Sequence, residues 1–153
     1  MNHEDYFKEA GKEASKALCK RDKCGAIIVI NNKIIGRGYN APPKDMEENC
    51  KCDLDLILSK KKKSDRTCCL HAEWRAIIDA IKKTPKLSGS TLYFVRVDES
   101  GNLKYSKEPY CTVCSRLVLD VDIKLFGLWT IDGPKLFPTK EYNDMSYSFH
   151  GSE

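Results

Sequence analysis

The chain has 153 residues, and its 26 Lys and Arg against 22 Asp and Glu give a formal net charge of +4 at pH 7. This length predicts a single domain over residues 1–153, with no apolar run near the roughly 18 residues of a membrane helix. The N-terminus lacks the basic and apolar regions of a signal peptide, so we expect a cytoplasmic protein whose eight cysteines are metal ligands and free thiols rather than disulfides. The modest charge suits an anionic small molecule and does not require a nucleic acid.

The first third of the chain predicts a helix followed by a hairpin. Apolar residues recur at helical spacing over residues 3–18, after Asn2, a residue type that caps helices. The β-branched run at 24–30 and the segment 33–38, with Asn31 and Asn32 between them, predict two antiparallel strands, the first buried on both faces. Pro42 and Pro43 then end the second strand.

Residues 44–70 form a polar insertion that carries four of the eight cysteines and the lysine run 60–63. Its middle, 54–59, predicts a short helix. A segment this long in a small domain is either disordered or held by a specific interaction.

After the insertion, helices alternate with strands. The pattern predicts a helix at 71–83, a strand at 91–97, a charged loop at 98–107, a helix at 111–120, a strand at 123–130 ended by a turn at 132–134, and a terminal helix or turn. An opening helix, a hairpin and then alternating strands and helices favour an α/β fold with a mixed, mostly parallel sheet covered on both faces.

The chemistry is indicated by His71 and Glu73, read together with Cys111 and Cys114. One imidazole and two thiolates at Cys-x-x-Cys spacing suit zinc, and three protein ligands leave a fourth position for a water that ionises near neutral pH. Glu73 is not needed as a ligand and is placed to carry protons. The alternative is a structural zinc whose fourth ligand comes from Cys68 or Cys69.

His-x-Glu followed by Pro-Cys-x-x-Cys is the signature of zinc nucleobase deaminases. With Gly25-Ala26-Ile27-Ile28-Val29, the Gly-Tyr-Asn-x-Pro stretch at 38–42, a cysteine-bearing insertion and Thr91-Leu92-Tyr93, the chain resembles the cytidine and deoxycytidylate deaminase superfamily, and within it the deoxycytidylate branch. The resemblance implies a three-layer α/β/α sandwich, bound Zn²⁺ and hydrolysis of dCMP to dUMP with release of ammonia.

The resemblance also implies substrate contacts. Asn40 corresponds to a residue that contacts the sugar, although it could instead be a turn residue before the prolines. The amide of Ala72 corresponds to a donor to the base carbonyl. Tyr110 interrupts the usual Pro-Cys pair and either reshapes the loop or lines the pocket. Arg75 stands where relatives commonly carry asparagine, and it either grips a phosphate or is a solvated helix residue.

Some relatives hold a second, structural zinc through this insertion, and they assemble as dimers or hexamers. The resemblance therefore predicts a possible second zinc site and a homo-oligomer. The candidate ligands are Cys19, Cys50, Cys52 and Cys68, with Cys24 and Cys69 as further candidates. Reduced free cysteines are the alternative.

Other functions compete with dCMP deamination. A close variant would act on another nucleoside, a base or an adenosine in RNA. RNA binding favours a basic face interleaved with aromatic residues, and the lysine run 60–63 has no aromatic neighbours, which argues against a nucleic acid partner. A non-catalytic zinc-binding scaffold is the alternative from another class, and the presence of Glu73 argues against it.

Overall fold

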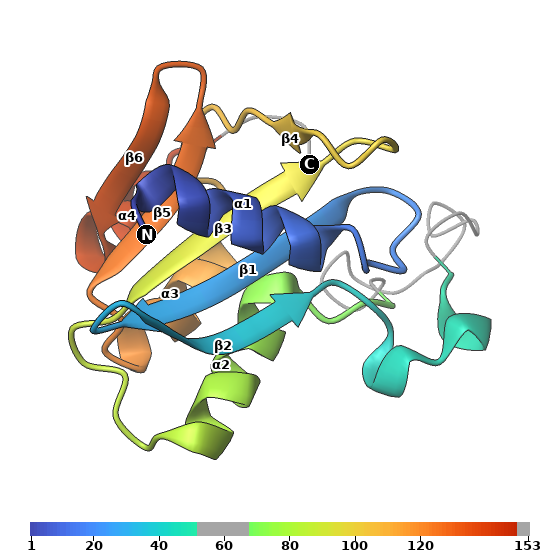
Figure 1. Cartoon of the computed structure of the whole chain (residues 1–153), viewed down its shortest axis with the longest axis horizontal. Helices are drawn as coiled ribbons and strands as arrows, with labels where there is room; N and C mark the ends of the chain where they lie inside the picture. The colour runs from blue at the N-terminus through green and yellow to red at the C-terminus, as the bar shows by residue number, and fades with distance from the viewer. Residues whose placement is uncertain (52–67, 150–153) are drawn as a thin grey trace.

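A computed structural model describes residues 1–51 and 68–149 of the chain (Figure 1). Within these residues a six-stranded sheet has the order β2-β1-β3-β5-β6, and β4 pairs with β3 outside that path. The strands are β1 Lys23–Ile30, β2 Lys33–Tyr39, β3 Thr91–Val97, β4 Leu103–Lys104, β5 Leu125–Thr130 and β6 Gly133–Pro138. The α-helices are α1 His3–Ala14, α2 Ala72–Lys83, α3 Thr112–Asp120 and α4 Thr139–Ser146, and 3-10 turns lie at Pro43–Asp45 and Glu47–Asn49.

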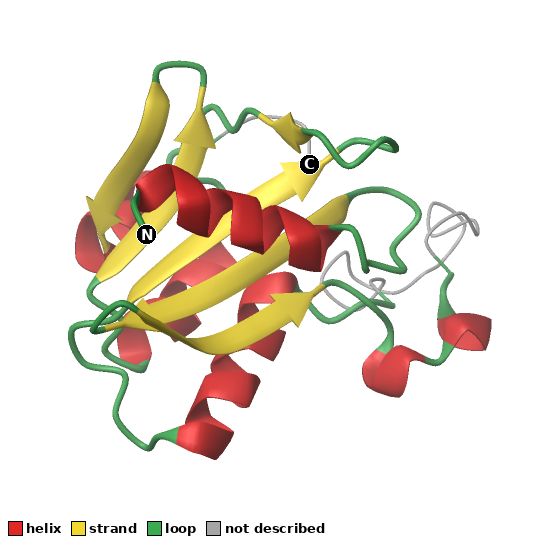
Figure 2. Ribbon diagram, viewed as in Figure 1, coloured by secondary structure: helices red, strands yellow, loops and turns green. Residues whose placement is uncertain are grey.

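Helices cover both faces of the sheet, which confirms the three-layer sandwich (Figure 2). The α1 helix packs on one face, where Phe7 and Ala10 contact apolar residues of β1 and β3. The other face carries α2, α3 and α4. Alternate residues of β1 enter the two cores, Ile27 on the α1 side and Ile28 on the α2 side, so its burial on both faces is also confirmed.

The first elements follow their local sequence. Asn2 accepts a hydrogen bond from the Asp5 amide and Asp5 accepts one from the Asn2 amide, a capping box that begins α1. The helix ends at Ala14, four residues before the predicted end at 18. The predicted hairpin is confirmed, with Asn31 and Asn32 at φ of 49° and 60° between antiparallel strands.

The prediction of a mostly parallel sheet was wrong. In the described residues only β3 and β5 pair in parallel, across α3, and the other strand pairs are antiparallel. The chain does not stop at the predicted turn after β5 but returns as β6, with Gly133 at φ 101°. Pro134 and Pro138 are tolerated because β6 is at the edge of the sheet, where one side needs no partner.

The predicted charged loop at 98–107 contains a further short strand, because β4 pairs with the end of β3. The predicted terminal helix is confirmed as α4. The short helix predicted at 54–59 lies outside the described residues. Within the described parts of the chain, no helix is long and apolar enough to cross a membrane.

Candidate active site

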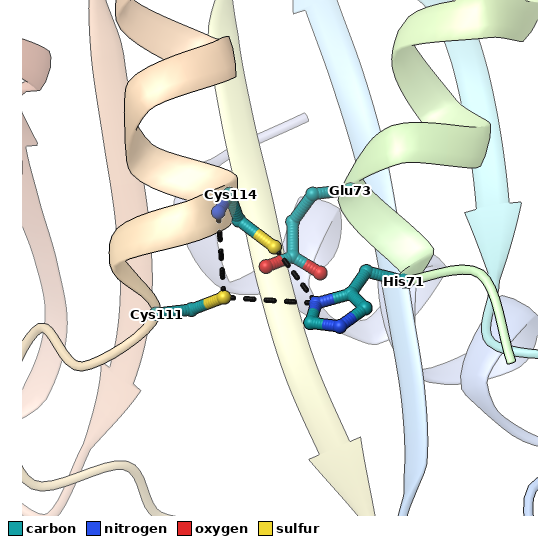
Figure 3. Close-up of side chains that lie close together, drawn as sticks. All are labelled: His71, Glu73, Cys111 and Cys114. Carbon is teal, nitrogen blue, oxygen red and sulfur yellow. Dashed lines mark hydrogen bonds between the residues drawn. The ribbon is translucent and has the colours of Figure 1, made fainter. Parts of the chain in front are cut away.

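Two helix starts bring the predicted zinc ligands together (Figure 3). His71 is the N-cap of α2, and Glu73 follows in its first turn. Cys111 is the N-cap of α3, and Cys114 lies in the first turn of that helix. One donor atom from each of these four residues lies within 4.8 Å of the others. Residues 40 positions apart in the chain therefore form one compact cluster.

The donor set fits a zinc ion. The Nδ1 atom of His71 lies 2.9 Å from the Cys114 sulfur and 3.6 Å from the Cys111 sulfur. One imidazole nitrogen and two sulfurs this close together are the ligand types that zinc prefers. Hydrogen bonds from Cys114 and His71 lower the pKa of Cys111 to about 5, which favours the thiolate that a metal requires.

Glu73 is the buried acid of the cluster, with 3% of its surface exposed. Burial, and then the neighbouring Cys111 thiolate, raise the pKa of Glu73 to about 7 in the metal-free protein. A carboxyl group with such a pKa can take up or release a proton near neutral pH.

Close packing of α2 on β2 fixes the position of this helix start. A Cβ atom on Gly38 would lie 2.3 Å from the Ala72 carbonyl oxygen and 2.4 Å from the Ala76 nitrogen. Only glycine permits this approach of strand and helix backbones. One turn into α2, the Trp74 ring stacks on the His71 ring, with centroids 4.7 Å apart and planes 13° apart.

A cavity opens beside the cluster, and several predicted substrate residues line it. His71, Glu73 and Cys111 form one part of its wall, and Asn40, Ala72 and Tyr110 form another part. The structure thus brings three of the four predicted substrate contacts to one cavity. Sequence reasoning missed further lining residues, namely Arg21, Leu70 and Phe94, together with Cys24, which it had considered only as a metal ligand.

Asn40 uses its side chain to hold the loop before β1. Its Oδ1 accepts a hydrogen bond from the Cys24 amide at 2.8 Å, and its Nδ2 donates to the Asp22 carbonyl at 2.7 Å. Its own carbonyl accepts from the Leu18 amide at 3.1 Å. Asn40 therefore does more than turn the chain before the prolines, because it fixes one edge of the cavity.

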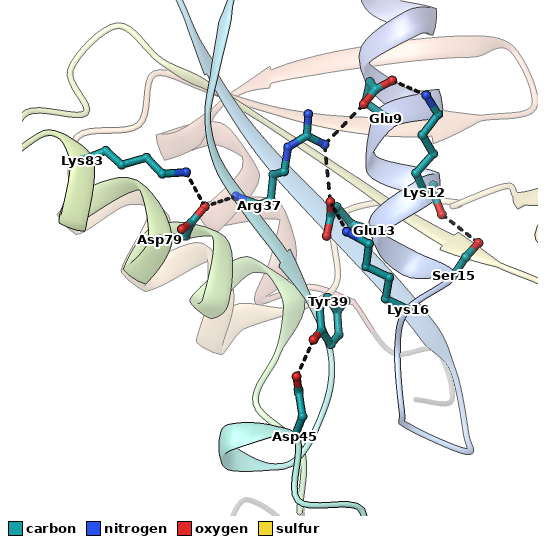
Figure 4. A network of polar contacts seen from close by, with 11 residues as sticks. Glu9, Lys12, Glu13, Ser15, Lys16, Arg37, Tyr39, Asp45, Asp79 and Lys83 are labelled. Carbon is teal, nitrogen blue, oxygen red and sulfur yellow. Dashed lines mark hydrogen bonds and ion pairs between the residues drawn. The ribbon is translucent and has the colours of Figure 1, made fainter.

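Arg75 does not line the cavity. Its guanidinium donates to the Asp45 carboxylate at 2.8 Å and lies 4.5 Å from the centre of the Tyr39 ring. The Tyr39 hydroxyl also donates to Asp45, at 2.5 Å (Figure 4). Residues two apart on a helix point in different directions, so Arg75 faces away from the side of α2 on which Glu73 lies. Arg75 thus holds the turn at 43–45 and does not lie at the substrate cavity, where it was predicted.

A second group of cysteines lies near the same cavity. The sulfurs of Cys50, Cys68 and Cys69 lie within 4.8 Å of one another. The Cys68 and Cys69 sulfurs are 3.7 Å apart, and both residues line the cavity, as does Cys19. Cys19 is not part of the three-sulfur group among the described residues, and Cys52 lies outside them. Sequence reasoning had ranked Cys69 below Cys52.

Comparison with known proteins places these features in a family. The sequence model of the cytidine and deoxycytidylate deaminase zinc-binding region matches residues 1–128. A deoxycytidylate deaminase of Mycobacterium phage D29 is 30% identical over 122 residues, which are 75% of this chain and 84% of the phage protein. One from Schizosaccharomyces pombe is 29% identical over 130 residues, 82% of this chain.

The chain spans 34% of the length of that fungal relative. Among solved structures, the apo form of a dCMP deaminase from the cyanophage S-TIM5 superposes with a TM-score of 0.59 at 26% identity, over 82% of each chain. The similarity to these proteins covers the part of the chain that carries the His71, Cys111 and Cys114 cluster.

Proposed function

Because the chain belongs to the cytidine and deoxycytidylate deaminase family, we propose that it is a zinc-dependent hydrolase that converts dCMP to dUMP and releases ammonia. The observation that carries the proposal is the buried Glu73 carboxyl, held beside a His and two Cys donors at the wall of a cavity. Beside three metal ligands and an open position for water, such a carboxyl can carry the protons of a hydrolysis.

His71, Cys111 and Cys114 would hold the zinc ion. When bound at such a site, zinc activates a water molecule as a nucleophile. Two thiolates offset the charge of the ion, and the α3 amide at Cys114, which donates to the Cys111 sulfur at 3.4 Å, supports the thiolate form.

Glu73 moves the protons of the reaction. It accepts a proton from the attacking water, donates one to the ring nitrogen of cytosine, and then assists the amine to leave as ammonia. The sum is hydrolysis, in which one water molecule enters and one ammonia molecule leaves. The pKa of Glu73, raised to about 7 before metal binds, suits a group that must alternate between the two protonation states.

The cavity wall offers groups that orient the base. Ala72 is the first residue of α2, and the first amides of a helix have no intrahelical acceptor. The Ala72 amide is therefore available to a base carbonyl. Phe94 and Tyr110, whose ring centres lie 6.3 Å apart, supply apolar surface for the ring. Asn40 holds the loop at the sugar side.

The test is ammonia release from zinc-loaded protein with dCMP, CMP, deoxycytidine, cytidine, cytosine, guanine and adenosine as substrates. We expect dCMP to be preferred. Glu73→Gln should abolish turnover and keep zinc bound, since the ligands are unchanged. Unchanged turnover in that variant would refute the mechanism, and turnover of another base in preference to dCMP would refute the substrate assignment.

We also propose that Cys50, Cys68 and Cys69 hold a second, structural zinc, with Cys19 or Cys52 as the fourth ligand. Three sulfurs within 4.8 Å of one another support this assignment. Zinc content of gently purified protein should be close to two ions per chain and should fall to one in Cys50→Ser and in Cys69→Ser. One ion per chain in the unchanged protein contradicts the second site.

The single domain over residues 1–153, the homo-oligomer and the cytoplasmic location stay predictions from the sequence. Sedimentation of the zinc-loaded protein tests the oligomer directly.

A further inference from the structure

The cavity beside the zinc cluster has an uneven distribution of charge. Among the lining residues that the structure describes, Arg21 is the one Lys or Arg side chain. Arg21 is exposed, whereas Glu73 is 3% exposed. The positive charge of the cavity therefore lies at its mouth and the carboxyl lies in its depth. A nucleotide has the complementary form, with an uncharged base at one end and a phosphate at the other.

The other arginines near this region are engaged elsewhere. Arg75 pairs with Asp45 at 2.8 Å, and Arg96 lies 3.7 Å from Asp22. Arg37, on β2, pairs with two glutamates of α1 (Figure 4). Arg21 has no ion-pair partner among the described residues, so its guanidinium is available to an anion that enters the cavity.

The backbone around Arg21 is held in place by contacts of the neighbouring residues. The Asp22 carbonyl accepts a hydrogen bond from Asn40, and the Asp22 carboxylate lies 3.4 Å from the Lys104 amine. On the other side of Arg21, the Leu18 amide donates to the Asn40 carbonyl. Asn40 thus fixes the loop on both sides of Arg21. A binding group on such a fixed backbone loses less conformational freedom when it binds.

We propose that Arg21 binds the 5′-phosphate of the substrate and makes the cavity selective for a nucleotide over a nucleoside, an inference that rests on the proposed deaminase function. The planar guanidinium can donate two parallel hydrogen bonds to phosphate oxygens. Arg21 therefore takes the phosphate-binding role that the sequence had suggested for Arg75, which pairs with Asp45 outside the cavity.

The experiment compares kcat/KM for dCMP and for deoxycytidine in zinc-loaded protein. Arg21→Ala should lower the value for dCMP by about 10- to 100-fold, the usual effect of losing hydrogen bonds to a charged group, and leave the value for deoxycytidine within about 3-fold. Arg21→Lys, which keeps the charge without the fork geometry, should be intermediate. The matched control is Arg116→Ala on α3, an exposed arginine that does not line the cavity.

Equal losses for both substrates would overturn the proposal, because they would point to the loop rather than to the phosphate. No loss for dCMP would overturn it as well. If the unchanged protein turns over neither substrate, the proposed function fails. The phosphate contact of Arg21 is then tested by calorimetry, which compares the binding of dUMP with the binding of deoxyuridine. If Arg21→Ala binds dUMP more weakly than the unchanged protein does but binds deoxyuridine equally well, the phosphate contact is supported. If the two proteins bind dUMP equally, or if the unchanged protein does not bind dUMP, the proposal is overturned.

Discussion

Replacement of Gly38 by alanine tests whether the contact between β2 and α2 positions the zinc site. The new Cβ atom would lie 2.3 Å from the Ala72 carbonyl oxygen, about 1 Å short of ordinary van der Waals contact. The obstacle is helix backbone, so relief requires the start of α2 to shift. His71 and Glu73 sit at that start and would move with it.

We expect two measurable effects. Overpacking of this kind costs about 1–3 kcal/mol of unfolding free energy. For a chain of this size that corresponds to a fall of about 2–12 °C in Tm, measured by thermal unfolding of the metal-free protein. Displacement of the start of α2 should also weaken zinc binding by about 10- to 100-fold. This is the usual effect of mutating a group that orients a metal ligand.

Gly25→Ala is the matched control. Its Cβ atom would meet the backbone of α1, at 2.2 Å from the Ala10 carbonyl oxygen, on the face of the sheet opposite the proposed zinc ligands of α2 and α3. Gly25→Ala should lower Tm to a similar extent and keep zinc affinity, measured by competition with a chromogenic chelator. If both variants lose zinc affinity equally, or if Gly38→Ala loses none, the contact between β2 and α2 does not position the metal site.

Three further perturbations give expected outcomes. The hydrogen bond from Tyr39, together with Arg75, lowers the pKa of Asp45. Its stabilising effect is present above about pH 4 and is lost as the pH falls through the lowered pKa, so Asp45→Asn should lower Tm near neutrality, and this difference in Tm should shrink with increasing acidity, read by pH-dependent thermal unfolding. Zinc at about 100 times its dissociation constant should raise the unfolding free energy by about 2.7 kcal/mol over that of chelator-treated protein, read by denaturant titration. Ser115→Ala removes the acceptor of the buried Asn143 amide, at 2.9 Å, and should cost about 1–3 kcal/mol in the same titration, whereas an effect below about 0.5 kcal/mol would contradict a role in docking α4.

The elements predicted well from the sequence are those with their own local signals. Helix α1 has a cap and a 3.6-residue period, and the first hairpin has two asparagines that accept positive φ. Strand β6 lacked such a signal, because Pro134 and Pro138 argue against a strand unless its edge position is known. Edge position is a property of the whole sheet, so the local pattern could not reveal it.

The site shows the same division. His71, Cys111 and Cys114 were predicted because their spacing and ligand chemistry are local properties of two helix starts. Arg21 was missed because it stands in a polar stretch without a motif, and the fold alone brings it to the cavity. Arg75 was considered as a phosphate ligand because it stands where relatives commonly carry asparagine, yet its direction on the helix takes it to Asp45.

The tight contact at Gly38 also bears on the proton chemistry. Bringing α2 against β2 leaves Glu73, in the first turn of α2, buried on the core side of the helix. Burial is the largest cause that raises the pKa of Glu73 to about 7. An exposed glutamate at this position would keep the usual pKa near 4.3 and would be too weak a base to accept and return a proton efficiently at neutral pH. The close packing of α2 on β2, in which Gly36 and Gly38 both take part, therefore bears on the place of the proposed metal ligands and on the burial of Glu73.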